Sequence, residues 1–194
     1  MKFRQTWTAI RALLIFTVVL GVVYPLAVTA VGQLVLPAQA NGSLIRVDGE
    51  VVGSSLIGQT FADADGNALP EWFQSRPSAA GDGYDGGASS GSNYGPENDD
   101  LIAAIDARRE AIESLDATTL IPADALTASA SGLDPHISPA DARLQVPRVA
   151  GARDLATEEV TRLVESMIQQ RDLGYLGEPT VNVLWLNIAL AKLG

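Results

Sequence analysis

Between Ala12 and Val31 the sequence reads ALLIFTVVLGVVYPLAVTAV, twenty residues without a charged side chain. The cationic residues Lys2, Arg4 and Arg11 precede this run, and the next charge is Arg46. At about 1.5 Å rise per residue, a helix of this length covers roughly 30 Å, the thickness of the hydrocarbon layer of a membrane. The sequence therefore predicts a transmembrane helix over residues 12–33, preceded by a cytoplasmic segment over residues 1–11.

Tyr24 and Pro25 lie inside this apolar run. Proline leaves a carbonyl of the preceding turn without its helical donor, and in hydrocarbon such a carbonyl needs a protein or water partner. We therefore expect Tyr24 and Pro25 to mark a contact with a neighbouring membrane helix rather than with lipid.

A cleaved secretory signal is the alternative interpretation, because Ala38-Gln39-Ala40 has the small-x-small pattern of a cleavage site. The apolar core of a signal peptide spans about 7–15 residues, which is shorter than this run, so a permanent anchor is favoured. In both interpretations the basic N-terminus stays in the cytoplasm and residues 34–194 lie outside it.

The outer part is strongly acidic. Only three of the 13 cationic residues precede Asn41, so ten remain there against all 23 acids, a net charge of −13 with the histidine neutral. Such a domain repels nucleic acid and anionic lipid, which argues against both as ligands. The chain has no cysteine, so its core must hold without disulfides, and about 150 residues bury enough surface for that.

Alternating and helical patterns follow one another irregularly in the outer part, which predicts a single α+β domain. Four segments are expected to form strands or strand-like edges: a hairpin around Asp48-Gly49 in LIRVDGEVV, the pair QTF and WFQ around the polar turn DADGN, LTASASGLDP running into a turn, and TVNVLW before a last helix. DADGN resembles the start of a calcium loop, but Ala68 and Gln74 stand where a glycine and a glutamate belong, so we reject calcium.

Three helices are expected from capping residues and apolar periodicity. Asn98 caps a helix with Leu101 to Leu115 on one face, and Ser138 caps a second that begins with Pro139 and is broken or kinked at Pro147. Thr157 is expected to cap a third helix, whose inward face is Val160, Leu163, Val164, Met167 and Ile168.

Common catalytic motifs are absent from the sequence. No lysine occurs between Lys2 and Lys192, which excludes a P-loop, and His136 is the single histidine, which makes a zinc enzyme improbable. A serine hydrolase built on His136 stays possible on paper, although no G-x-S-x-G elbow is present. A membrane-anchored extracytoplasmic hydrolase and a secreted binding domain therefore remain as alternatives from other classes.

Seven stretches occur in this order along the chain: GVVYPLAVT, GSSLIGQTF, FQSRPSAA, YDGGASSGSNYGPENDDL, TASASGLDPHISP, QVPRVAGAR and GEPTVNVLWLNIAL. Together and at these spacings they resemble the KdpC family, the C subunit of the bacterial high-affinity potassium-transporting Kdp ATPase. The resemblance runs from the membrane helix to the last residues, with Trp72 standing where a tyrosine is expected before Phe73.

The resemblance implies an accessory, non-catalytic subunit of an ATP-driven potassium uptake pump, assembling and stabilising its other subunits. The implied partners are the channel-like subunit KdpA, the P-type ATPase subunit KdpB and the very small membrane subunit KdpF. Glycine-rich backbone can follow the contour of a partner, so we expect the stretch from Tyr84 to Asp100 to be a docking loop rather than a mobile one. The docking residues expected from the chain are Tyr24, Pro25, Arg76, Tyr84, Gly86, Gly87, Asn93, Tyr94 and Gly95, with Arg76 either a charged contact or an internal tie.

The resemblance also implies a catalytic chaperone that raises the ATP affinity of the P-type subunit, with Ser129, Ser131, Gly132 and Gln145 matching the residues linked to nucleotide. Charge placement puts these residues outside the cell, where ATP is absent, and a net charge of −13 repels a polyphosphate. Structural roles account for them as well: Gly132 for a positive φ, the serines for turn capping, and Gln145 for a helix end beside Pro147. We therefore expect no cofactor on this chain by itself, with ATP acting at the level of the complex.

Overall fold

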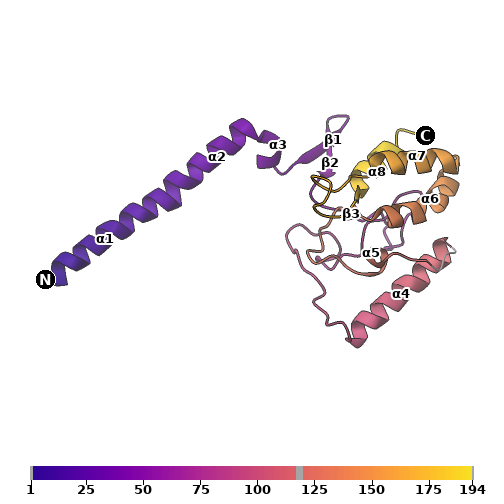
Figure 1. The fold of residues 1–194 in the computed structure, drawn as a ribbon, viewed down its shortest axis with the longest axis horizontal. Helices are drawn as coiled ribbons and strands as arrows, with labels where there is room; N and C mark the ends of the chain where they lie inside the picture. The colour runs from indigo at the N-terminus through magenta and orange to yellow at the C-terminus, as the bar shows by residue number, and fades with distance from the viewer. Residues whose placement is uncertain (1, 117–119, 194) are drawn as a thin grey trace. The chain divides into compact units, whose positions relative to one another are not determined.

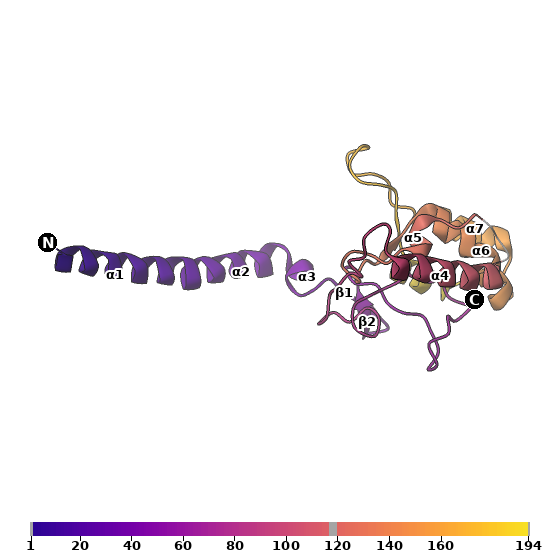
Figure 2. The ribbon, with the colours of Figure 1, turned by 90° about the horizontal axis from the view of Figure 1, so that it is seen from below.

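The computed structural model describes residues 2–116 and 120–193. The chain divides into two compact units, Met1–Leu44 and Ile45–Gly194. Figures 1 and 2 draw both from two directions, and each unit is considered by itself below.

The first unit is dominated by one long apolar helix. It is made of α1 (Lys2–Val18), the π-helical turn η1 (Val19–Val23) and α2 (Tyr24–Val35), and the short helix α3 (Pro37–Ala40) follows. Its continuous span Phe3–Val35 is long and apolar enough to cross a membrane, and none of its most apolar part is buried within the protein. The helix thus extends beyond the charge-free run at both ends.

The π-helical turn ends at Val23, two residues before Pro25. The backbone N–H of Tyr24 donates to Val19 O, five residues back, in place of the usual four. Such a widened turn re-pairs backbone groups that the proline ring would leave unmatched. The helix therefore passes through Pro25 without interruption.

The second unit mixes helices with short strands, which confirms the expected α+β class. Its described elements are β1 (Leu44–Val47), β2 (Glu50–Ser54), α4 (Asp99–Asp116), α5 (Ala123–Leu126), β3 (His136–Ile137), α6 (Pro139–Arg153), α7 (Thr157–Met167), β4 (Val181–Asn182) and α8 (Val183–Leu190). Helices α6, α7 and α8 gather around β3 and β4, whereas α4 lies along one edge of the unit (Figure 1).

The hydrophobic core lies between α6, α7, α8 and the antiparallel pair β3–β4. Val160 and Val164 lie one turn apart on α7 and are both fully buried, as expected for the inward face of this helix. Leu163, Met167 and Ile168 pack against the core from partly buried positions. The fully buried apolar members with the largest side chains are Phe73, Ile137, Leu186, Leu190, Val149, Val160, Val164, Val181 and Val183.

Two of the expected helix caps are confirmed and one is wrong. The side chain of Asn98 accepts from the backbone N–H of Asp100 at 2.8 Å, and Ser138 Oγ accepts from Asp141 N at 3.1 Å. Thr157 is not a cap: Ala156 holds that position without a side-chain bond, and Thr157 is already helical, its carbonyl accepting from Thr161 Oγ1 at 2.8 Å.

Pro147 does not break its helix. α6 continues from Pro139 to Arg153, where Asp154 ends it in a left-handed conformation. A proline interrupts only one internal hydrogen bond, and on this helix Val146, Val149 and Ala150 are all buried in the core. Their burial holds the helical turn together around the missing bond.

The hairpin at Asp48-Gly49 is confirmed, since both residues have positive φ, 51° and 88°. The strand expected in LTASASGLDP is wrong: α5 ends at Leu126, and residues 127–135 are bends and irregular segments. Gln59–Phe61 and Trp72–Gln74 are not strands either, although a bridge between Ala62 and Ala68 closes the polar turn.

The last strand is shorter than expected, because β4 has two residues and α8 begins at Val183. Asn182 Oδ1 accepts from Trp185 N at 3.1 Å, which starts the helix inside the apolar run. The polar turn DADGN is closed by its own aspartate, since Asp63 Oδ1 accepts from the backbone N–H groups of Asp65 and Asn67 at 2.9 and 2.8 Å. Hydrogen bonds from Asn67 lower the pKa of the Asp63 carboxyl.

Candidate functional site

Two segments far apart in the sequence, residues 76–91 and 129–136, pack against each other; we call them the turn cluster. Ser131 O accepts from Ser90 N at 3.0 Å and from Ser89 Oγ at 2.9 Å. Ser129 N donates to Pro77 O at 3.2 Å. The first half of the glycine-rich stretch is therefore fixed onto the SASG turn.

Ser78 is the hydrogen-bonding centre of the turn cluster. Its hydroxyl donates to Gly132 O at 2.6 Å and accepts from the backbone N–H groups of Ala80 at 3.1 Å and Tyr84 at 2.9 Å. One small side chain thus ties both segments together. The sequence analysis missed Ser78, although serine in a glycine-rich turn region signals such local backbone capping.

Glycine at 91 and 132 is required by close approach of backbone to backbone. A Cβ at Gly132 would meet Ser90 O at 2.6 Å and Ala80 Cβ at 2.7 Å, and its φ of +68° confirms the expected positive value. A Cβ at Gly91 would lie 2.6 Å from Ala130 O. These glycines allow the two segments to touch.

Tyr84 faces inward from the turn cluster. Its hydroxyl donates to Arg76 O at 2.7 Å, and its ring fills the space beside Gly58, where a Cβ would lie 2.4 Å from the ring. Burial raises the pKa of the Tyr84 hydroxyl to about 12. Tyr84, expected as a docking anchor, is placed by the structure as an internal support.

Arg76 forms the internal tie that was one of its two expected roles. Its guanidinium donates to Asp134 Oδ2 at 3.4 Å and to Thr127 O at 3.3 Å. His136 Nδ1 lies 3.4 Å from Asp134 Oδ1, and the backbone N–H of His136 donates to the same oxygen at 3.0 Å. Hydrogen bonding from His136, with a smaller contribution from the Arg76 charge, lowers the pKa of the Asp134 carboxyl.

The other expected docking residues of the glycine-rich stretch are exposed. Gly87 N donates to Asp85 Oδ1 at 2.8 Å, and Asn93, with φ 54°, donates through Nδ2 to Gly91 O at 3.0 Å. A Cβ at Gly86 would lie 3.7 Å from Ile57 Cδ1, an ordinary contact, whereas a Cβ at Gly95 would meet nothing within 4 Å, and Tyr94 is exposed. Tyr24 and Pro25 belong to the apolar helix of the other unit, where Tyr24 is exposed.

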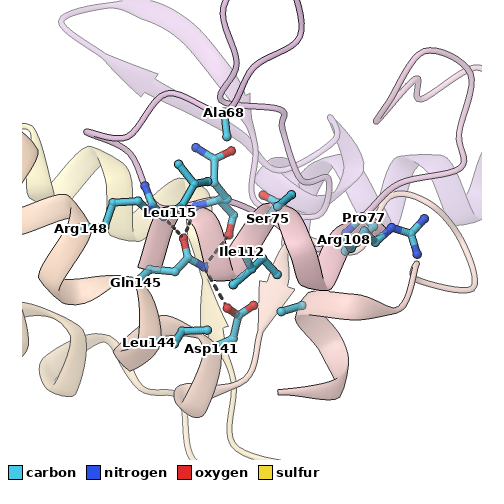
Figure 3. A pocket seen from close by; sticks show the side chains of 13 residues that line it. Ala68, Ser75, Pro77, Arg108, Ile112, Leu115, Asp141, Leu144, Gln145 and Arg148 are labelled. Atoms are coloured by element: carbon cyan, nitrogen blue, oxygen red, sulfur yellow. Dashed lines mark hydrogen bonds between the residues drawn. The ribbon is translucent and has the colours of Figure 1, made fainter. Parts of the chain in front are cut away.

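Gln145 lies in a different place, at the floor of a groove of about 230 Å³ between α4 and α6 (Figure 3). The apolar wall of the groove comes from Ile112 and Leu115 of α4 and Leu144 of α6. Asp141 and Arg148 flank Gln145 along α6, one turn away on either side.

Gln145 is a buried tie between α6 and the segment before the turn cluster. Its Oε1 accepts from Gln74 N at 2.6 Å and from Arg148 at 2.8 Å, and its Nε2 donates to Gln74 O at 3.2 Å and Asp141 Oδ1 at 3.1 Å. The expectation that Gln145 serves structure holds, but its place at a helix end is wrong. It lies in the middle of α6, with only 5% of its surface exposed.

The four residues linked to nucleotide by resemblance do not line one pocket. Ser129 and Ser131 line a shallow depression with Arg76 and Asp134, whereas Gln145 lines the groove. Ser131 Oγ accepts from Leu133 N at 3.1 Å and is a turn cap as expected, but Ser129 Oγ, although buried, caps nothing among the described residues. The segment from Gln74 to Ser78 separates the two places, since it bonds to Gln145 at one end and to Gly132 at the other.

Asn187 repeats the arrangement of Gln145 deeper in the core. Its Oδ1 accepts from Phe73 N at 3.0 Å and its Nδ2 donates to Phe73 O at 2.9 Å. Two buried amides thus hold the irregular segment around Phe73 and Gln74 as strand neighbours would. In the sequence, only the polar residue inside the apolar run LNIAL signals this role.

The family model and the relatives that match this chain all point to the same family. The family model for KdpC, described as K+-transporting ATPase, c chain, matches residues 6–192. Proteins described as potassium-transporting ATPase KdpC subunit are similar to this chain. One from Caulobacter vibrioides (strain NA1000 / CB15N) is 58% identical over 177 residues, covering 91% of this chain and 87% of the relative.

Two further relatives carry the same description. The protein of Mycobacterium bovis (strain BCG / Pasteur 1173P2) is 53% identical over 193 residues, covering 98% of this chain and 99% of the relative. That of Kineococcus radiotolerans is 56% identical over 189 residues, covering 96% and 93%. Since the family model spans most of the apolar helix, the turn cluster and the buried amides, and these relatives are 53–58% identical over more than 90% of the chain, the chain belongs to the KdpC family, the c chain of the K+-transporting ATPase.

Proposed function

We propose that this chain is a non-catalytic accessory subunit of the pump. Its apolar N-terminal helix holds it in the membrane, and its outer domain assembles and stabilises the other subunits. The observation that carries the proposal is that the residues of the family motifs act as ties within the domain. Ser78, Tyr84 and Gln145 all direct their polar groups to backbone of the same unit. A domain built this way offers a rigid surface to partners.

The proposed partners are the potassium-selecting subunit KdpA, the ATP-hydrolysing subunit KdpB and the small subunit KdpF. Tyr24 and Pro25 support a helix contact in the membrane, because the π-helical turn leaves an irregular surface there. In the glycine-rich stretch, Asn93, Tyr94 and Gly95 are exposed, as are Gly86 and Gly87, and we propose these residues for docking. Affinity purification of the full chain from potassium-starved membranes should recover KdpA and KdpB, whereas a membrane-anchored hydrolase or a secreted binding domain would be recovered without them.

The proposed orientation places the N-terminus in the cytoplasm and the domain outside. The support is the position of Arg4 and Arg11 before the apolar run, with no positive charge again until Arg46. Because the chain has no cysteine, single introduced cysteines report topology cleanly. In intact cells a membrane-impermeant maleimide should label Ser92→Cys and leave Gln5→Cys unlabelled; the reverse pattern would overturn the orientation.

Any effect on ATP use is proposed to be indirect. With the domain outside, a rise in the ATP affinity of the P-type subunit must be passed on through packed helices or through KdpA, a coupling typically of about 1–3 kcal/mol. Gln145 supports this view, because both ends of its amide are bonded inside the domain.

The experiment is to compare Gln145→Ala with the wild type in the assembled pump. We expect the rate of potassium transport to fall only in proportion to the loss of assembled complex. The ATP concentration that gives half-maximal transport should stay the same in the complex that remains. Labelling of residues 129–145 by a photoreactive ATP analogue in the intact complex would contradict the proposal and restore direct nucleotide binding.

A further inference from the structure

A hairpin projects from the second unit between α7 and β4; we call residues 169–180 the arm (the gold loop that stands away from the helices in Figure 2). Gln169 and Thr180 exchange two backbone hydrogen bonds at its base, at 2.8 and 3.0 Å. Asp172 and Leu176 exchange two more near its tip, both at 2.9 Å. An ion pair between Arg171 and Glu178 spans the two sides, so the arm has a defined shape.

The arm contributes nothing to the core. All ten residues from Gln169 to Glu178 are exposed, although the backbone of the arm is paired at Gln169 and between Asp172 and Leu176. The exposed fractions of its large side chains are 80% for Leu173, 68% for Tyr175 and 49% for Leu176. Three such side chains on one projection are unusual for a surface in contact with water alone.

The backbone conformation of Leu173 also indicates that the arm has a role other than folding. Its φ is +53°, in the left-handed region, and Gly174 follows with +81°. A leucine in this region is strained by contact between its Cβ and its own backbone, and turns normally place glycine, asparagine or aspartate there. Since Leu173 packs against no core and strains its turn, folding does not explain it. Strain of this kind is characteristic of functional positions.

The side chains of the arm favour a protein pocket over a membrane surface or a second copy of this chain. Leucine and tyrosine tips anchor protein contacts by filling apolar pockets, with the tyrosine hydroxyl at the polar rim. Arg171, Asp172 and Glu178 give the arm a net charge of −1, with no lysine on it. Anionic membrane surfaces attract clusters of lysine and arginine, so this arm does not fit them. A second copy of a domain of net charge −13 would meet like charge.

We propose that the arm is an interaction element that inserts Leu173, Tyr175 and Leu176 into an apolar pocket on another subunit of the same K+-transporting ATPase. The pocket has a hydrogen-bonding group for the Tyr175 hydroxyl and a neutral or basic rim facing Asp172 and Glu178. This rests on the proposed function, because it requires that the chain assembles with other subunits. The preformed backbone lowers the entropy lost on docking, as for any preorganised loop.

Leu173→Gly gives the sharpest test, because it should lower assembly without lowering stability. Relief of the left-handed strain should leave the unfolding temperature of the full chain in detergent unchanged or raised by about 1–4 °C. The same change removes an anchor and should lower recovery of the partner subunits in co-purification by about tenfold. An arm with only a structural role would change both quantities in the same direction or neither.

Two variants complete the test. Tyr175→Ser should also reduce co-purification, whereas Val51→Ser, an exposed apolar residue on the β1–β2 hairpin, should leave it unchanged. If the wild type itself recovers no pump subunit, the proposed function fails. If the wild type and both arm variants recover the subunits equally well, the arm proposal alone fails.

A photoreactive phenylalanine analogue at position 175 identifies the partner directly in membranes that contain the whole pump. We expect a cross-link to another subunit of the pump, absent when the analogue is placed at position 51. A cross-link only to lipid, or only to a second copy of this chain, would overturn the proposal.

Discussion

The turn cluster and the arm are both glycine-containing loops, yet the protein uses them in opposite ways. In the turn cluster, a Cβ added at Gly91 or Gly132 would collide with backbone of the facing segment. In the arm, a Cβ at Gly174 or Gly177 would meet nothing within 4 Å. Glycine permits close packing in the first region, whereas in the second it only permits a turn.

The difference teaches that loop composition does not indicate mobility or contact with partners. The glycine- and serine-rich stretch looks solvent-facing in sequence, but its first half is bonded to residues 129–136 through Ser89 and Ser90. The arm carries two leucines and a tyrosine, side chains that are common in protein cores, yet all its residues from Gln169 to Glu178 are exposed. We therefore expect the turn cluster to determine stability and the arm to affect assembly.

The largest expected effect is from Gly132→Ala. The new Cβ collides with Ser90 O and Ala80 in a left-handed backbone, and together clash and strain should lower the free energy of unfolding by about 3–5 kcal/mol. The matched control is Gly174→Ala, with φ +81° and open space, which should cost only about 1–2 kcal/mol from backbone strain. Thermal unfolding of the two full chains measures the difference; equal losses would remove the distinction between the regions.

Ser78→Ala should have the next largest effect. It leaves Gly132 O and the backbone N–H groups of Ala80 and Tyr84 without their shared partner, which should cost about 2–3 kcal/mol. Ser92→Ala, in the exposed half of the glycine-rich stretch, is the control and should lie within about 0.5 kcal/mol of the wild type. Chemical denaturation of both variants checks the pair, and a neutral Ser78→Ala would show that the turn cluster does not support the domain.

A smaller, pH-dependent effect is expected at Asp134. Its folded-state pKa is lowered, chiefly by hydrogen bonding from His136, so the folded state binds fewer protons than the unfolded state between the two pKa values. The stabilisation is complete above the unfolded value of about 3.9 and is lost as the pH falls through the folded value. Asp134→Asn should therefore be less stable than the wild type at neutral pH, and the gap should narrow as the pH falls below about 4. A gap that is constant down to about pH 2.5 would contradict this account.

The smallest effect is expected in the arm. Glu178→Gln removes the ion pair with Arg171, and since exposed ion pairs contribute little, the free energy of unfolding should change by less than about 0.5 kcal/mol. Thermal unfolding of the variant and the wild type at low and high salt measures this change in the free energy of unfolding. A loss comparable to that of Ser78→Ala would mean that the arm supports the fold after all.

Local signals in the sequence predicted much of the fold. The apolar run, the Asp48-Gly49 hairpin, the caps Asn98 and Ser138 and the inward face of α7 depend on residues within one or two turns of each other, and all are found as expected. The strand predicted over residues 126–135 was wrong. These residues contact residues 76–91, and no local pattern in the sequence reveals contacts between such distant segments.

The candidate site was less predictable than the fold, because its hydrogen bonds join residues that are far apart in the sequence. Gln145 and Gln74 are 71 positions apart, and Asn187 and Phe73 are 114 apart, so neither pairing is visible in a local window. Tyr84 was recognised as an anchor, but whether an aromatic side chain points inward or outward depends on Gly58 and Arg76, which lie elsewhere in the sequence. The arm was not predicted because its turn at Leu173-Gly174 places a leucine where turns normally have glycine, asparagine or aspartate, so the local sequence gives no clear turn signal.

Hydrogen–deuterium exchange of the full chain, in detergent by itself and within the purified pump, tests the contrast between the two regions most directly. The account predicts slow exchange at Tyr84, Ser90 and Gly132 in both samples, and exchange at residues 171–178 that slows on assembly. Fast exchange in the turn cluster of the chain by itself, together with an arm unaffected by the other subunits, would contradict it.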